Sequence, residues 1–111
     1  MLDGIVSRLE TYMDLLATRQ KLVASNIANA DTPGYKTRDI DFQHEYQSLL
    51  EGGAPQAEEV PGLTSRNDGN NVSLDRESRL LAENAIRFSL ASTLVRGEIR
   101  AVRNAIKEGN G

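Results

Sequence analysis

Apolar residues recur at alternating spacings of four and three along the first thirty positions of the chain. The set is apolar throughout except at Gln20, and its other members are Leu2, Val6, Leu9, Met13, Leu16, Val23, Ile27 and Ala30. This heptad spacing is typical of a long helix that packs one side against other helices. A second set widens the apolar face, so we expect neighbours on more than one side: Ile5, Tyr12, Leu15 and Leu22.

The last third of the chain repeats the pattern. From Leu74 the same spacing passes through Ser78, Leu81, Ala85, Phe88, Ser92, Val95, Ile99, Val102 and Ile106. Ser73 is a natural N-cap for this helix, and Gly109 can end it. Three further leucines again make the apolar face broad: Leu80, Leu90 and Leu94.

These two segments predict a mainly α fold. Residues 1–30 and 73–108 are expected to pair as a coiled-coil-like hairpin that forms one helical core domain. Helices of globular proteins average about 11–12 residues, so two helices this long are unusual in a chain of 111 residues. Because two wide apolar faces cannot cover each other, other subunits are expected to bury the remainder. An isolated hairpin with smaller packing elements is the alternative.

The intervening residues 31–72 are predicted to form a turn, a short extended segment and a flexible loop. Residues 35–42 alternate weakly between apolar and polar, which favours a short strand. Residues 42–50 could form one or two helical turns. Residues 51–61, EGGAPQAEEVP, are rich in Gly, Pro and Glu and are typical of a mobile loop.

A sharp turn is predicted where the first helix ends. Pro33 presets the backbone for the first central position of a type II turn, and Gly34 supplies the positive φ of the second. Asn26 and Asn29 lie in the last helical turn, where asparagine is otherwise unfavourable. Their amides can tie the helix end to the turn and fix the direction in which the chain leaves it.

Composition and charge limit the classes of function that the chain can have. Only 39% of residues are hydrophobic and 5% aromatic, so an isolated core would be small. Residues 31–72 hold eight acidic and three basic residues, whereas 73–111 hold five and seven, which suits self-association between unlike segments. The net charge of −3 does not favour nucleic-acid binding. No apolar run is long enough to span a membrane, and the first residues lack the pattern of a secretory signal.

The sequence offers little catalytic chemistry. Cys is absent, and the single His, His44, lies near Asp39, Asp41 and Glu45 at spacings that match no metal-ligand motif. We interpret that cluster as part of a solvated loop. Neither catalytic nor metal-binding residues are predicted, and no cofactor is expected.

Residues 25–35, SNIANADTPGY, resemble the motif ANxxNxxTPGY of the bacterial flagellar rod and hook family, with Ser25 in place of Ala. The following TRDIDF of residues 37–42 and DGNNVSLDRE of residues 68–77 resemble the proximal-rod members of that family. The family implies a structural protein and not an enzyme. Its members leave the cytoplasm through the flagellar type III export apparatus without a cleaved signal peptide.

The resemblance also implies where the chain works and with what. Paired terminal helices would stack in many copies as a helical tube, the periplasmic rod of the flagellar basal body, which transmits torque. The implied partners are other rod subunits, the ring or adaptor at the rod base, and the export apparatus. The alternatives are a sister subunit of the proximal rod, or a soluble helical export chaperone or adaptor that forms a small complex.

Two groups of residues are the candidates for these roles. The predicted assembly interface consists of Leu9, Met13, Leu16, Val23, Ile27, Leu81, Phe88, Val95, Ile99, Val102 and Ile106. The predicted motif and turn residues are Asn26, Asn29, Thr32, Pro33, Gly34 and Tyr35.

Overall fold

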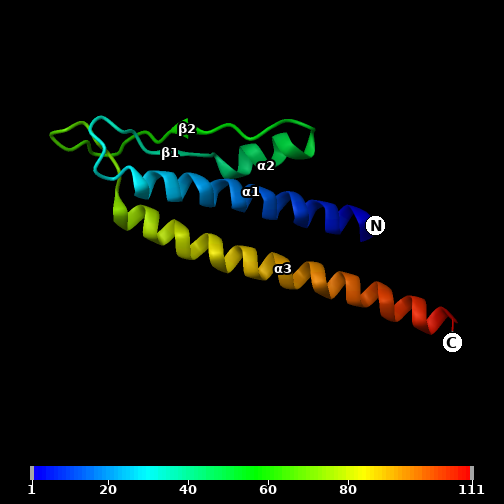
Figure 1. Cartoon of the computed structure of the whole chain (residues 1–111). Helices are drawn as coiled ribbons and strands as arrows, with labels where there is room; N and C mark the ends of the chain where they lie inside the picture. The colour runs from blue at the N-terminus through cyan, green and yellow to red at the C-terminus, as the bar shows by residue number, and fades with distance from the viewer. Residues whose placement is uncertain (1, 111) are drawn as a thin grey trace.

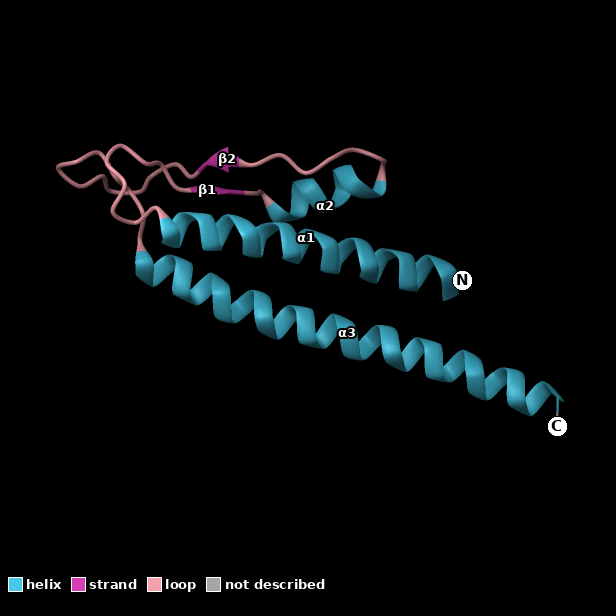
Figure 2. Ribbon diagram, in the orientation of Figure 1, coloured by secondary structure: helices cyan, strands magenta, loops and turns pink. Residues whose placement is uncertain are grey.

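In the computed structural model, which describes residues 2–110, two long helices lie side by side and a small insert covers one of them (Figure 1). Helix α1 spans Leu2–Ala28, and helix α3 spans Leu74–Asn110. Their antiparallel packing confirms the predicted mainly α hairpin, and very little of the chain is strand (Figure 2). The molecule is elongated, with extents of 70 × 26 × 17 Å.

Helix α3 begins at the predicted cap. The Ser73 hydroxyl accepts a hydrogen bond from the backbone N–H of Arg76 at 3.2 Å, which satisfies one of the free N–H groups of the first turn. At the other end the helix continues through Gly109 to Asn110, so the predicted end at residue 108 is wrong. Glycine permits a helix to stop but does not force it to.

The pairing of the helices leaves the end of α3 uncovered. Asn26 of α1 lies against Glu77 of α3, and Gln20 lies against Asn84. Extending this antiparallel register places the start of α1 level with Ala101, so the last turns of α3 project beyond it (Figure 1).

The insert is a short two-stranded sheet and a helix. Strand β1 (Arg38–Asp39) pairs antiparallel with β2 (Glu58–Glu59), and α2 spans Phe42–Leu50, which confirms the predicted helical turns. The prediction of a loop throughout residues 51–61 is wrong at β2. Two consecutive glutamates give no apolar alternation, so only pairing with β1 makes them a strand.

The hydrophobic core is small and centred on α1. Its buried apolar side chains are Leu15, Leu16 and Val23 of α1, Ala91 of α3, and Ile40 and Val72 of the insert. Both α2 and β1 pack on α1, and α3 packs mainly on α1, with one side-chain contact from Arg76 to Asp39 of β1. Helix α1 therefore lies between the insert and α3 (Figure 1), and α3 is covered along only one side.

Candidate assembly interface

The turn after α1 has the geometry predicted for Pro33–Gly34. Gly34 has a φ of +75°, and the N–H of Tyr35 donates to the C=O of Thr32 at 3.2 Å, which closes the turn. The N–H of Gly34 also donates to the C=O of Asp68 at 2.8 Å. The turn is thereby joined to the far end of the insert.

Asn26 links the end of α1 to both other parts of the fold. It is 1% exposed, and its Nδ2 donates at 2.8 Å to the C=O of Arg38 and to the carboxylate of Glu77. Its Oδ1 accepts from the hydroxyl of Tyr35 at 3.0 Å and from the N–H of Arg38 at 3.1 Å. Four hydrogen bonds from one amide fix the direction in which the chain leaves the helix, as predicted.

Two asparagines at the end of the insert complete this junction. Asn70 is fully buried, and its Nδ2 donates at 2.8 Å to the C=O groups of Asn29 and Thr32. Asn29 in turn accepts a hydrogen bond from the Thr32 hydroxyl at 3.0 Å. The Oδ1 of Asn71 accepts from the N–H of Thr37 at 2.6 Å. These side-chain hydrogen bonds to the backbone hold the segments together, as backbone hydrogen bonds would in a longer sheet.

A buried ionic cluster holds β1 against both long helices. Arg19 of α1 donates to both carboxylate oxygens of Asp39, at 3.0 and 2.9 Å. Arg76 of α3 contacts the same carboxylate at 2.6 Å and also the carboxylate of Glu77 at 3.0 Å. Two guanidinium groups therefore neutralise two carboxylates where three segments meet.

The two carboxylates respond to burial in opposite ways. Burial alone would raise the pKa of Asp39, but the hydrogen bonds and charge of Arg19, together with hydrogen bonds from the Ile40 N–H and Arg76, outweigh burial and lower this pKa. For Glu77, burial raises the pKa, and the hydrogen bond from Asn26 and the charge of Arg76 offset only part of that effect.

This arrangement corrects the interpretation of Asp39, Asp41, His44 and Glu45 as part of a solvated loop. Asp39 is buried in the ionic cluster, and Glu45 is 4% exposed and accepts from the N–H of Gln56 at 3.0 Å. Only Asp41 and His44 are exposed. Across residues 2–110, no group of three potential metal ligands comes together.

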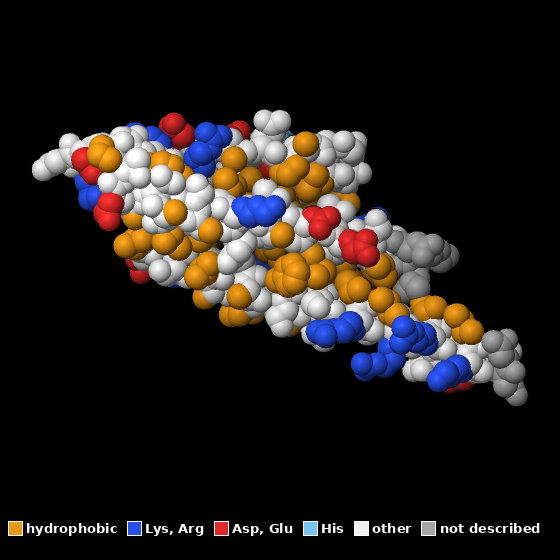
Figure 3. Space-filling view, in the orientation of Figure 1, with side chains coloured by type: hydrophobic (Ala, Val, Ile, Leu, Met, Phe, Trp, Pro, Cys, Tyr) orange, Lys and Arg blue, Asp and Glu red, His pale blue; other side chains and the backbone are white. Residues whose placement is uncertain are grey.

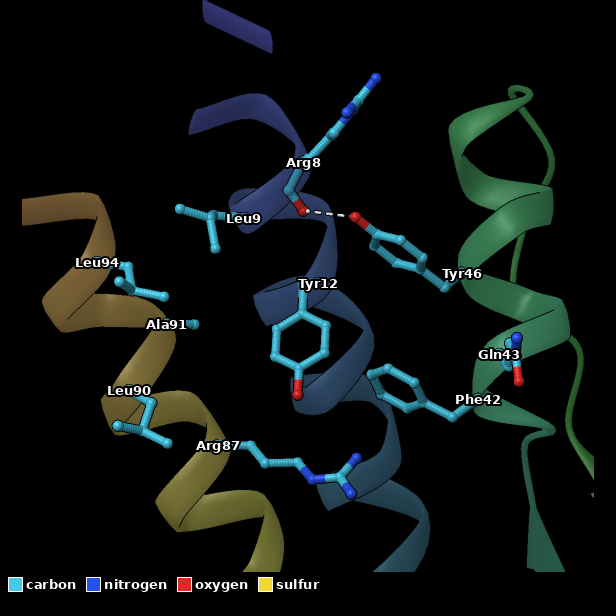
Figure 4. Close-up of a pocket in the computed structure, with 10 residues that line it drawn as sticks. All are labelled: Arg8, Leu9, Tyr12, Phe42, Gln43, Tyr46, Arg87, Leu90, Ala91 and Leu94. Carbon is cyan, nitrogen blue, oxygen red and sulfur yellow. Dashed lines mark hydrogen bonds between the residues drawn. The ribbon is translucent and has the colours of Figure 1, made fainter. Parts of the chain in front are cut away.

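An apolar groove of about 510 Å³ lies where α1, α2 and α3 converge (Figure 4). On one wall, the ring of Tyr12 stacks edge-on against those of Phe42 and Tyr46, with centroid distances of 5.3 and 6.2 Å. On the other wall, Leu90 and Leu94 of α3 are 61% and 58% exposed. The groove is open because α2 covers α1 without reaching α3.

The predicted interface residues of α1 and α3 differ in exposure. Leu16 and Val23 are 1% exposed and belong to the core of the single chain. Ile27, next to the last residue of α1, is 36% exposed. Four residues of α3 are 39–58% exposed, namely Leu81, Phe88, Ile99 and Ile106. The half-buried members are Leu9, Met13, Val95 and Val102.

The line of α3 that faces α1 is not the predicted apolar line. Glu77, Asn84 and Ala91, seven residues apart, are 0–3% exposed, whereas Leu81 and Phe88 lie to one side. Polar side chains occupy this line because they meet polar partners on α1: Asn84 donates to Gln20 at 3.2 Å. The one polar residue in the α1 pattern, Gln20, was the sequence signal for this contact.

Sequence reasoning missed the residues of the polar junction. Arg19, Arg76 and Glu77 carry no periodic signal, and their pairing depends on segments that are distant in the chain. Residues 65–71, SRNDGNN, are dense in turn-forming residues, and this pattern indicates only a turn. Their side-chain bonds to the Gly34 turn required the three-dimensional fold.

The fold and its uncovered faces define a helical structural subunit, whose large exposed apolar side chains suit packing by further chains. No helix within residues 2–110 has the length and apolar content needed to cross a membrane. The family model described as Flagella basal body rod protein matches residues 13–36, which hold the end of α1 and the turn.

Relatives named Flagellar basal body rod protein FlgB match nearly the whole chain. The relative from Escherichia coli (strain K12) is 32% identical over 98% of this chain and 97% of its own length. That from Yersinia enterocolitica is 30% identical over 97% of each, and that from Proteus mirabilis (strain HI4320) is 28% identical over 98% of this chain and 100% of its own. The chain belongs to the flagellar basal body rod protein family, as a FlgB-type structural rod subunit.

This assignment favours the main hypothesis over its alternatives, a FlgC-type sister subunit and a helical export chaperone or adaptor. The alignment with the Escherichia coli relative extends over 135 positions, more than the 111 residues of this chain. The relative therefore contains residues that have no counterpart here.

Proposed function

We propose that the chain assembles in many copies, together with other rod subunits, into the helical tube of the proximal rod. Its role is mechanical and not enzymatic: the tube transmits torque across the periplasm from the ring or adaptor at its base. The chain reaches this place through the flagellar type III export apparatus without a cleaved signal peptide.

The observation that carries the proposal is the surplus of apolar surface on α3. Four large apolar side chains of this helix are 58–63% exposed and lie outside the small core of the single chain: Ile86, Leu90, Leu94 and Ile106. Covering a leucine that is about 60% exposed would contribute about 1 kcal/mol. A subunit with several such residues gains stability only when neighbours pack along it.

The buried polar side chains that join the insert and the turn to the long helices support a mechanical role for the same molecule. Arg19, Asp39 and Arg76 fasten the insert to both helices, and Asn26 and Asn70 fasten the turn. Fully paired buried polar groups fix one arrangement because each lost partner leaves a desolvated group unsatisfied. An insert held in this way can bear on a neighbouring subunit without moving relative to its own helices.

Electron microscopy of basal bodies from a strain that lacks the gene tests the proposal. We expect rings without a rod, and rods restored by the wild-type copy. Complete rods in the deletion strain would overturn the proximal-rod assignment. A copy carrying Asp31→Asn, an exposed acidic residue of the turn, is the matched control and should restore rods.

A further inference from the structure

A second groove follows α1 and α3 on the side away from α2. It has a volume of about 610 Å³, and its walls include Ala17, Lys21 and Ala24 of α1 and Ala85 and Phe88 of α3. Phe88 is 42% exposed, although it lies between the two helices. Small residues on both walls would allow another helix to approach closely.

Beyond this groove, towards the N-terminal end of α1, the faces that continue its two walls carry opposite charges. We call these faces the acidic rim of α1 and the basic rim of α3. On α1, Glu10 and Asp14 precede Ala17 by seven and three residues and share its face. On α3, Arg96 and Arg103 flank Ile99 by three and four residues. Figure 3 shows acidic side chains over α1, basic side chains over the C-terminal half of α3, and apolar side chains between them.

These rim charges have no ionic partners in the single chain. Glu10, Asp14, Arg96 and Arg103 are exposed, and none forms an ion pair within residues 2–110. By contrast, Arg87 on the other side of α3 is paired with Glu83. The charges beside the second groove are therefore free to meet another molecule.

One buried group in the groove also lacks a partner. Asn84 is 3% exposed, and its Nδ2 donates to Gln20, but its Oδ1 has no hydrogen bond within the described chain. A buried acceptor without a donor is unfavourable unless a neighbour supplies one. A single polar residue of this kind in an apolar helical contact commonly fixes the register between helices.

We infer that this face packs against a second copy of the chain, with the acidic rim of α1 in one copy against the basic rim of α3 in the other. The inference rests on the proposed function and names the surface through which like subunits meet. Because the hairpin is antiparallel, the N-terminal half of α1 and the C-terminal half of α3 lie at the same level (Figure 1). Two copies can therefore match their rims without sliding along the long axis.

A second copy fits this face better than it fits the first groove. One face that holds both signs on opposite rims is complementary to a like face. The first groove is bordered by Arg8 and by Arg87, whose charge Glu83 neutralises, and its lining holds no acidic residue that could meet Arg8 of a second copy. The acidic and basic rims thus favour self-association through the second groove.

Cysteine cross-linking tests the inference, since the natural chain contains no Cys. Two copies of the full chain, one with Asp14→Cys and one with Arg96→Cys, are expressed together in the deletion strain, and the basal bodies are oxidised. A disulfide between the two copies is the expected product, in large excess over the product of a Glu51→Cys control. Cross-linking no stronger than this control, or cross-linking only to a different rod protein, would overturn the inference.

Charge reversal provides an independent readout. Arg96→Glu with Arg103→Glu should weaken association of the purified chain about tenfold or more at low salt, and the same loss is expected for Glu10→Lys with Asp14→Lys. Mixing the two reversed proteins should restore association, because the rims are again complementary. No recovery on mixing would contradict the inference. If wild-type protein still restores rods in that case, the proposed function stands and only this surface is wrong.

Discussion

Asp39 is the residue on which the junction of the three segments depends. Replacing it by asparagine would leave the guanidinium group of Arg19 near the core without a countercharge and would leave Arg76 with Glu77 alone. We expect Asp39→Asn to lower the free energy of unfolding by about 3 kcal/mol, the usual cost of breaking a buried ion pair. Urea unfolding followed by circular dichroism measures this. Asp31→Asn, at an exposed position, should change stability little, and an equal loss in both variants would refute the cluster's role.

The shifted pKa values give this protein a stability that depends on pH in two opposing ways. The pKa of Asp39 is lowered below its ordinary 3.8, so its contribution is complete above that value and is lost as the pH falls through the folded-state pKa. The pKa of Glu77 is raised above 4.5, so the folded state holds its proton more tightly. Stability therefore falls as the pH rises from 4.5 through the raised pKa.

Glu77→Gln separates these effects. A neutral amide cannot titrate, so the decline in stability above pH 4.5 should disappear, while the loss at lower pH that Asp39 causes should remain. Unfolding free energies measured across pH 3 to 8 provide the comparison. A variant whose stability declines above pH 4.5 as steeply as that of the wild type would exclude Glu77 as the source.

At Gly34, backbone conformation alone determines whether a side chain is tolerated. Its φ of +75° is strained for any residue with a Cβ, and for valine most of all. No atom lies within 4 Å of the added Cβ, so the effect is conformational and not steric. We expect Gly34→Val to block rod assembly while helix content by circular dichroism changes little. Normal rods in a strain with this variant would contradict the prediction.

At the scale of elements, the helices could be predicted because heptad periodicity and capping are local properties. The start of α3 follows from Ser73, and α1 ends before the Pro33–Gly34 turn, at Ala28 and not at the predicted residue 30. The side that α3 turns toward α1 could not be predicted, since Glu77 and Asn84 are buried only because Asn26 and Gln20 lie opposite. Strand β2 likewise forms only because it pairs with β1.

Adjacent residues of α3 distinguish packing within the chain from packing between chains. Leu94 is 58% exposed on the first groove, whereas Val95 is half-buried. Leu94→Asp should leave the unfolding free energy nearly unchanged but abolish incorporation into rods, because a neighbour would bury an unpaired charge. Val95→Asp should also destabilise the isolated hairpin. Normal incorporation of Leu94→Asp would show that this part of α3 remains in solvent.

The charge distribution along the sequence indicated self-association, but the contact surfaces emerged only from the whole molecule. Residues of α1 and α3 that are about sixty to seventy positions apart in sequence line one groove, which no local pattern encodes. The same long-range folding brings Arg19, Asp39 and Arg76 together. Periodicity predicted that apolar surface would remain uncovered, and the fold determines where.

The whole molecule has several apolar and charged faces, and this determines how it should associate. A subunit whose contact surfaces differ and do not close on each other adds further copies without limit, whereas an adaptor stops at a fixed number. We expect the dilute chain to have a radius of gyration near 18.4 Å and to form steadily larger species as concentration rises. Small-angle X-ray scattering of the dilute chain measures the radius of gyration, and sedimentation velocity over a concentration series follows the growth. A plateau at one small oligomer would favour an adaptor, and loss of growth in the chain with Arg96→Glu and Arg103→Glu would identify the face of the second groove as a surface that drives self-association.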